Sequence, residues 1–171
     1  MFARHRKIPM LIINNVTRFL DSKKIPYQAF VLPAEKLGAD ETAKLLGVNP
    51  ELVYKTIVVT RPNGKPILAV IPGSHRVDLK YLAAAMGEKK VVLPTELEAE
   101  MLTGLQAGGI SPLALVNKGF QVVIASEAYK QSHIHVSGGQ RGLNILLPVI
   151  SLAKLTRARF AEISTGDSET S

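Results

Sequence analysis

The sequence contains no cysteine, and only 5% of its 171 residues are aromatic. The absence of cysteine excludes disulfides, thiolate metal sites and a cysteine nucleophile, and it suits a reducing cytoplasm. Long apolar runs are also missing, because no stretch approaches the roughly 20 residues that a membrane span needs. We therefore expect a cytoplasmic protein with no membrane partner.

The N-terminus superficially resembles a signal peptide, because basic residues precede the apolar residues Ile8 to Ile13. That run is only about six residues long, contains Pro9, and leads into Asn14 and Asn15 rather than a small-residue cleavage site. Residues 1–13 are predicted to be a poorly ordered extension.

Negative charge is scarce: Lys and Arg number 21 against 14 Asp and Glu, a formal net charge of +7. Such a balance favours anionic partners, with nucleic acid the first candidate and an anionic membrane surface the second. Lys89, Lys90, Arg157 and Arg159 are predicted to form a solvated face, although a tRNA backbone would also suit them.

With 46% hydrophobic residues, the chain is expected to fold as one domain. Apolar periodicity and turn residues predict irregularly interleaved short helices and about seven strands, which indicates a mixed α/β (α+β) fold with a curved sheet. Asp40 is the predicted cap of the second helix, 73–76 a loop, and 164–171 a disordered tail. The predicted helices cover about 16–22, 41–46, 79–86, 96–103 and 149–163, and the predicted strands 27–32, 53–60, 66–72, 91–93, 120–125, 134–137 and 143–147.

Lys55 is the anomalous residue of the strand 53–60. Alternate residues of a strand share a face, so Lys55 lies with Val53, Ile57 and Val59 on the more apolar side. A lysine is rarely buried without a partner. Either its stem covers apolar surface while the ammonium reaches solvent, or the ammonium faces a ligand in a cleft.

Two glycine-rich stretches, 108–112 and 138–142, offer main-chain amides that side chains do not shield. Each could simply be a tight turn. The second follows a predicted strand and contains Arg141, so it could also hold a phosphate or a ribose. Together with Lys55, the two stretches predict a polar cleft built largely from backbone.

Other chemistries find less support in the sequence. His133 and His135 share a strand face with Ser137, but a metal site needs further ligands and no third histidine is near in sequence. Ser111 or Ser137 would need a positioned base to act as a nucleophile, and no G-x-S-x-G elbow is present. Nucleotide-binding glycine motifs are absent too. No metal or cofactor is therefore predicted.

Three blocks, 53–56, 108–112 and 136–143, closely resemble the YbaK and prolyl-tRNA synthetase-associated domain family in their order and spacing. The resemblance covers residues 14–163. It implies a strongly bent, mostly antiparallel mixed sheet surrounded by helices. It also implies hydrolysis of the ester between a wrong amino acid, notably Cys or Ala, and tRNA for proline. Aminoacyl-tRNA would then be the partner, with prolyl-tRNA synthetase as a further one.

The resemblance also carries over residue roles. Lys55 corresponds to the family's essential lysine, the loop from Gly108 to Pro112 would embrace the aminoacyl ester, and Ser137 would lie near the terminal adenosine. We assign catalysis to Lys55 and to the amides of Gly108 and Gly109. The predicted substrate-binding residues are Leu32, Thr56, Ile110, Ser111, Pro112, Ser137, Gly138, Gly139, Arg141 and Asn144.

The chain departs from the Cys-tRNA deacylase pattern at two places. Asn144 stands where those members have an aspartate, so it can hydrogen-bond but carries no charge. Those members also line their amino-acid pocket with a tyrosine and a phenylalanine. In this sequence the corresponding positions fall near Leu32 and near the pair Gly38 and Ala39.

A trans-acting aminoacyl-tRNA deacylase acting on Cys or another small amino acid on tRNA(Pro) is the favoured hypothesis. The aminoacyl ester is labile, so orientation and oxyanion stabilisation could suffice without a metal. The alternative is a non-catalytic tRNA- or nucleotide-binding module of the same fold. A third hypothesis is a hydrolase of some other small ester.

Overall fold

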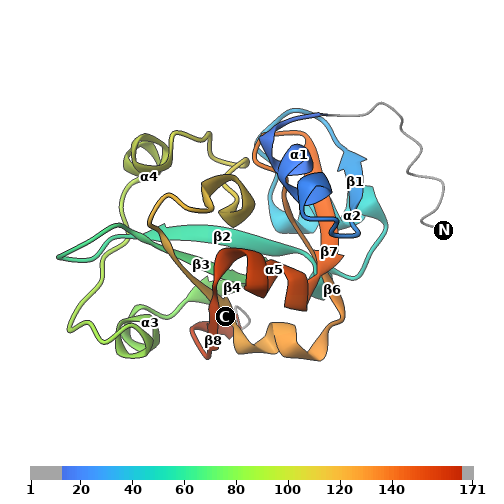
Figure 1. Cartoon of the computed structure of the whole chain (residues 1–171). Coiled ribbons are helices and arrows are strands. Elements are labelled where there is room, and N and C mark those ends of the chain that lie inside the picture. The colour runs from blue at the N-terminus through green and yellow to red at the C-terminus, as the bar shows by residue number, and fades with distance from the viewer. Residues whose placement is uncertain (1–12, 167–171) are drawn as a thin grey trace.

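The computed structural model describes residues 13–166, which form short helices around two main sheets (Figure 1). The predicted extension 1–13 therefore lies, apart from Ile13, outside the described residues. The α-helices are α1 (Asn15–Ser22), α2 (Ala39–Leu46), α3 (Leu79–Ala85), α4 (Glu96–Thr103) and α5 (Val149–Thr156), with 3-10 turns η2 (Pro50–Leu52), η3 (Pro112–Leu115) and η4 (Ser126–Lys130). The strands are β1 (Gln28–Val31), β2 (Tyr54–Val59), β3 (Ile67–Pro72), β4 (His75–Val77), β5 (Gln121–Ala125), β6 (His133–Ser137), β7 (Leu143–Pro148), β8 (Arg159–Ala161) and β9 (Ser164–Gly166).

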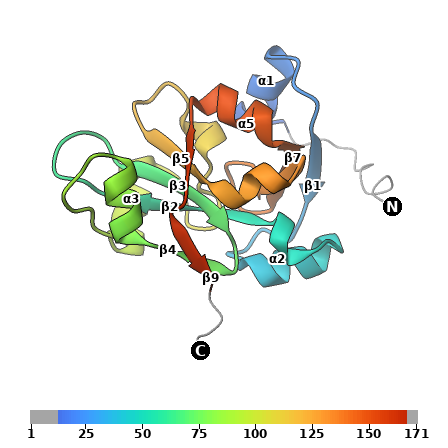
Figure 2. The same cartoon turned by 90° about the horizontal axis from the view of Figure 1, so that it is seen from below.

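The predicted mixed α/β class is confirmed, with nine short strands among residues 13–166 in place of about seven. One sheet has the order β1-β7-β6 and is antiparallel throughout. The other has the order β2-β3-β5-β8, in which β2 and β3 are antiparallel while β5 pairs in parallel with β3 and β8. A single parallel bridge, Val53 to His135, links the two sheets. Strands β4 and β9 form a separate two-stranded ribbon, visible near the C-terminus in Figure 2.

Local sequence signals explain most element boundaries. Asn14 and Thr17 form a capping box at the start of α1, and Thr95 and Glu98 form another at α4, each of which satisfies two otherwise unpaired amides. Asn63 and Gly64 between two apolar runs predict a hairpin. It is present between β2 and β3, and Gly64 adopts the positive φ of 102° that its turn requires.

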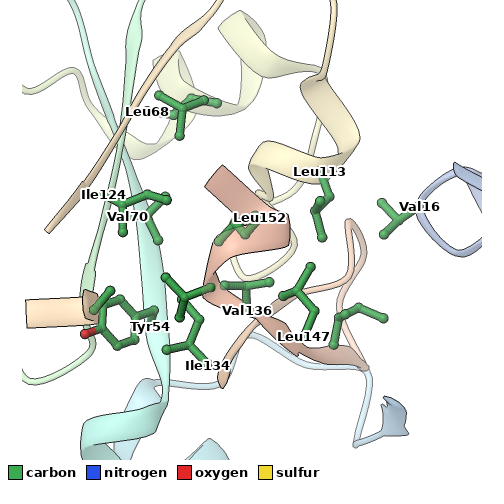
Figure 3. Packing of buried hydrophobic residues seen from close by; sticks show 14 of the residues in the cluster. Val16, Tyr54, Leu68, Val70, Leu113, Ile124, Ile134, Val136, Leu147 and Leu152 are labelled. Atoms are coloured by element: carbon green, nitrogen blue, oxygen red, sulfur yellow. The ribbon is translucent and has the colours of Figure 1, made fainter. Parts of the chain in front are cut away.

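The core lies on both faces of the sheet that contains β2. Tyr54 and Val58 point into a cluster shared with the second sheet, while Val59 points into a cluster covered by α3. Figure 3 shows the first cluster, in which residues of both sheets meet side chains from α1, η3 and α5. The predicted alternation along this strand is therefore confirmed, but both of its faces are apolar. No helix among residues 13–166 is long and apolar enough to cross a bilayer.

The C-terminal prediction was wrong in two respects. The last helix ends at Thr156 rather than 163, because Arg157 adopts a left-handed conformation with φ 57° and ends the helix. The chain then forms β8 and β9, so Ser164–Gly166 is a strand rather than a disordered tail. Residues 167–171 of that predicted tail lie outside the described part of the chain.

Three smaller predictions also need correction. Asp40 does not cap α2, since Gly38 occupies the cap position and Asp40 lies in the first turn. Part of the predicted loop 73–76 belongs to β4, which follows β3 through a tight turn. The predicted strand 91–93 is reduced to one bridge between Val92 and Thr60.

Candidate active site

A cleft of about 460 Å³ lies beside β2, the edge strand of its sheet. At Val53 the strand bridges β6 of the other sheet, and beyond that point its edge borders the cleft. An edge strand leaves main-chain groups unpaired, which a ligand can use. The cleft is lined from β2 by 53–58, from the first glycine-rich loop by Gly108 and Ile110, from the other sheet by Ser137, Leu143 and Asn144, and from the rim by Leu32, residues 35–39 and residues 93–96.

Lys55 is partly buried and lines this cleft together with Thr56. Its position is fixed by its neighbours in β2, because Tyr54 is only 4% exposed and Val58 also lies in the core. The strand is further held by six paired positions with β3, one of which places Lys55 opposite Ile71. The ammonium group therefore extends from a rigid support.

The two glycine-rich loops pack directly against each other. A Cβ atom at Gly109 would lie 2.8 Å from the Cα of Gln140 and 3.0 Å from the main-chain nitrogen of Arg141. The Arg141 guanidinium donates from Nε to the carbonyl oxygen of Ala107 at 2.7 Å. Gly108 has a φ of 91°, which other residues adopt only under strain. The sequence patterns 108–112 and 138–142 thus form one packed unit.

Hydrogen bonding divides the amides of the first loop into two groups. The Gly109 amide donates to the carbonyl oxygen of Gln106 at 2.8 Å, so it already has an acceptor. Within residues 13–166, the amides of Gly108 and Ile110 have no acceptor, and both residues line the cleft. Ser111 is fully buried, and its hydroxyl accepts from the amide of Leu113. The loop therefore presents Gly108 and Ile110, rather than Ser111, to a ligand.

Ser137 and Asn144 line the cleft as a directly paired set on β6 and β7. Asn144 is 6% exposed, and its Oδ1 lies 2.8 Å from Nδ1 of the fully buried His135. Because an amide oxygen only accepts, the His135 ring donates from Nδ1. That bond leaves the Asn144 amide nitrogen, a donor, for a ligand in the cleft.

His135, one of the two histidines considered and set aside as metal ligands, lies behind the cleft and supports Asn144. Burial lowers the pKa of its imidazole below the usual value, and the hydrogen bond with Asn144 opposes that shift. His133, on the same strand face, is exposed and lies 3.0 Å from the Ser132 hydroxyl. Among residues 13–166 no three His, Asp or Glu residues gather as metal ligands would. The period of two along β6, which places His135 on the face of Ser137, could have identified it as a support for this pair.

We expect His135 to make stability depend on pH. Its lowered folded-state pKa means that the unfolded chain binds the proton first, so the stabilisation is complete above about pH 6.5 and declines as pH falls below that value. The difference in free energy of unfolding between wild type and His135→Gln should therefore narrow on acidification, by at most about 1.4 kcal/mol per pH unit. Urea unfolding between pH 8 and pH 5 measures this, with the exposed His133→Gln as the matched control. A difference that stays constant would contradict it.

The predicted site residues separate into two groups. Leu32, Lys55, Thr56, Gly108, Ile110, Ser137 and Asn144 line the cleft. Gly109, Ser111, Pro112, Gly138, Gly139 and Arg141 do not line it and instead support the loops behind it. The amides of Gly138 and Gly139 are already bonded, to the Leu143 carbonyl oxygen and the Ser137 hydroxyl.

Sequence reasoning missed one side of the cleft, which is formed by the start of α4 and residues 35–37. Glu96 and Lys36 form an ion pair at this rim, with both side chains about half exposed. Such an exposed pair contributes at most about 1 kcal/mol. The capping box at Thr95 marked the start of the helix, but nothing in the local pattern placed that start beside Lys55.

Comparison with known proteins gives consistent similarities. A family model described as "Aminoacyl-tRNA editing domain" matches residues 33–155. The chain is 38% identical to an Enterococcus faecalis protein named "Putative Cys-tRNA(Pro)/Cys-tRNA(Cys) deacylase EbsC" over 153 residues, which span 88% of this chain and 93% of that protein.

Two solved structures share the fold. Hypothetical protein APE2540 has a TM-score of 0.82 at 24% identity, covering 89% of this chain and 100% of the other. A protein described as "a putative trans-editing enzyme for prolyl tRNA synthetase" has a TM-score of 0.76 at 22% identity, covering 91% and 100%. At these identities the likeness establishes a common fold.

Proposed function

Since the chain belongs to the aminoacyl-tRNA editing domain family, we propose that it is a trans-acting aminoacyl-tRNA deacylase that removes Cys or another small amino acid from tRNA(Pro). The name of the Enterococcus faecalis relative supports this choice of substrate. The fold neighbour described as a trans-editing enzyme supports action alongside prolyl-tRNA synthetase. We infer a cytoplasmic location, where aminoacylated tRNA is used.

One observation carries the proposal: Lys55 lines the same cleft as Gly108 and Ile110, although more than fifty positions separate them in sequence. In ester hydrolysis, negative charge develops on the carbonyl oxygen as water attacks. An ammonium group and two main-chain amides without acceptors are suited to stabilise that charge. Stabilisation of this kind requires only that the donors are already oriented, which the packed loops and β2 provide.

In the proposed reaction, water adds to the ester carbonyl, and the tetrahedral intermediate collapses to release the amino acid. The ribose oxygen of the terminal adenosine leaves and takes up a proton. Lys55 and the amides of Gly108 and Ile110 bind the oxyanion, while Ser137 and the amide nitrogen of Asn144 hydrogen-bond the adenosine. Orienting an intrinsically labile ester accounts for a large part of the rate enhancement.

We assign the amino-acid end of the substrate to the rim around Leu32, Leu37, Gly38 and Ala39. Gly38 has an ordinary φ of −78°, and a Cβ there would meet no atom within 4 Å. A larger side chain at this position would therefore fill the cleft without disturbing the fold.

Gly38→Leu is expected to change substrate selectivity. The added side chain should reduce hydrolysis of Cys-tRNA(Pro) relative to Ala-tRNA(Pro) by about tenfold or more, because one substituent in an apolar pocket changes selectivity by 10- to 200-fold. The ratio of kcat/KM values measures this. Gly38→Ala is the control for the change at the helix cap, and an unaltered ratio in Gly38→Leu would place the amino acid elsewhere.

The proposed function is tested by incubating the protein with Cys-, Ala-, Ser- and Thr-charged tRNA and following loss of the amino acid. Hydrolysis of at least one supports a deacylase. Failure on all four with tRNA binding intact would favour the non-catalytic binding module instead. The absence of any tRNA affinity would point to a hydrolase of another small ester.

A further inference from the structure

A second hollow, of about 500 Å³, lies between α1 and α5. Figure 2 shows these two helices side by side at one edge of the molecule. Three cations line the hollow: Lys23 at the end of α1, and Lys154 and Arg157 at the end of α5. No carboxylate lines it, and Ser151 and Asn117 add polar groups. We refer to this hollow as the α1–α5 groove.

The three cations of the groove are exposed and form no ion pair with any carboxylate among residues 13–166. Each lies near a helix C-terminus, whose partial negative charge attracts cations. Two such termini together contribute about one negative charge, so the groove remains net positive. Three like charges around one hollow would be compensated by a polyanion.

The backbone around the groove is strained at residues that are not glycine. The three non-glycine residues with positive φ in the described part of the chain are Lys24, Asn117 and Arg157. Asn117 and Arg157 line the groove, and Lys24 follows Lys23. Helices α2 and α4 end on Gly47 and Gly104 in the same left-handed conformation, the usual choice at such ends. After α1 and α5 a cation, Lys24 or Arg157, adopts this conformation instead of a glycine, and strained residues of this kind gather at functional sites.

The walls of the groove are rigid, and a short stretch of chain connects them to the cleft. Val16 of α1, Leu113 of η3 and Leu152 of α5 are buried in one cluster beneath it (Figure 3). The turn η3 begins at Pro112, where the first glycine-rich loop ends, and residue 117 lies in the groove. Nine residues thus connect Gly108 of the cleft to the groove, a span of at most about 30 Å.

We infer that the α1–α5 groove binds the sugar–phosphate backbone of the same tRNA whose 3′ end enters the cleft, an inference that rests on the proposed function. Phosphate oxygens would accept from Lys23, Lys154 and Arg157. Contacts of this kind position a nucleic acid without reading its sequence. The groove would therefore contribute affinity for the body of the tRNA, while the cleft acts on the ester.

The test combines Lys23→Gln, Lys154→Gln and Arg157→Gly in one variant and compares two substrates. These are Cys-tRNA(Pro) and the same amino acid esterified to a terminal CCA trinucleotide, which lacks the body of the tRNA that the groove is inferred to bind. We expect KM for the tRNA to rise about tenfold, and the slope of log affinity against log salt to fall by about one unit per lost contact. Hydrolysis of the trinucleotide ester should not change. Arg157→Gly alone should keep or raise Tm, because glycine relieves the strain at φ 57°.

The control is Lys80→Gln with Lys89→Gln and Lys90→Gln, which removes the same charge from an exposed face around α3. An equal rise in KM in this control would assign the effect to net charge and overturn the inference. Unchanged KM and salt slope in the groove variant would also overturn it. The inference would also be overturned if the groove variant lost binding to anionic phospholipid vesicles while it retained its affinity for tRNA. If wild type hydrolyses neither substrate, the proposed function fails instead.

Discussion

Lys55→Ala is expected to lower the rate of deacylation of mischarged tRNA by about 100- to 1000-fold. Removing one donor to an oxyanion has effects of that size in other hydrolases. The loss should appear in kcat, because the proposed charge interaction strengthens only as the intermediate forms. Single-turnover deacylation of Cys-tRNA(Pro) measures it directly.

The matched control for this experiment is Lys80→Ala, which removes an exposed lysine from α3. Wild-type activity in Lys55→Ala would remove the central residue of the proposed site. A rise in KM with kcat unchanged would give Lys55 a different task, the anchoring of the terminal adenosine or its phosphate. Because Lys55 is only partly buried in a strand held by Tyr54 and Val58, the variant should remain folded.

Gly109→Ala should damage both stability and activity. The new methyl group would lie 2.8 Å and 2.9 Å from two main-chain atoms of Gln140, which cannot move without separating the two loops. We expect the free energy of unfolding to fall by about 1–3 kcal/mol, the usual cost of overpacking. Deacylation should fall by about 100-fold, as small displacements of positioning groups do, because Gly108 and Ile110 move with the loop.

Gly166→Ala is the control for this substitution, since a Cβ there meets no atom within 4 Å. Urea unfolding and single-turnover deacylation should both give wild-type values for it. Full activity in Gly109→Ala would mean that the contact between the loops does not position the site. Loss of stability with unchanged activity in the residual folded protein would lead to the same conclusion.

Features encoded in short stretches were predictable from the sequence. The cap at Asn14, the capping box at Thr95 and the turn at Gly64 depend on residues within four positions of one another, so the local pattern was sufficient. The mixed fold class and the grouping of Lys55 with the first glycine-rich loop also followed, through strand alternation and the family resemblance.

Features that depend on tertiary contacts or on unusual backbone were not predictable. Arg157 ends α5 in a conformation that normally signals glycine, so the apolar pattern suggested a helix up to residue 163. A glycine-rich motif does not indicate that the Gly109 amide donates a hydrogen bond within its own turn, to the carbonyl oxygen of Gln106. The bond between His135 and Asn144 joins neighbouring strands and requires their register.

The single bridge between Val53 and His135 limits the positions at which insertions and deletions can be accepted during evolution. Lys55 lies two residues after one bridge partner, and Ser137 lies two residues after the other. Since strand side chains alternate, one inserted residue in either interval would turn the functional side chain to the opposite face. The hairpin loop around Gly64 is under no such constraint, because a longer loop adds only a small entropic cost. Insertions and deletions compatible with activity are therefore confined to loops such as this one and excluded from the two short intervals beside the bridge.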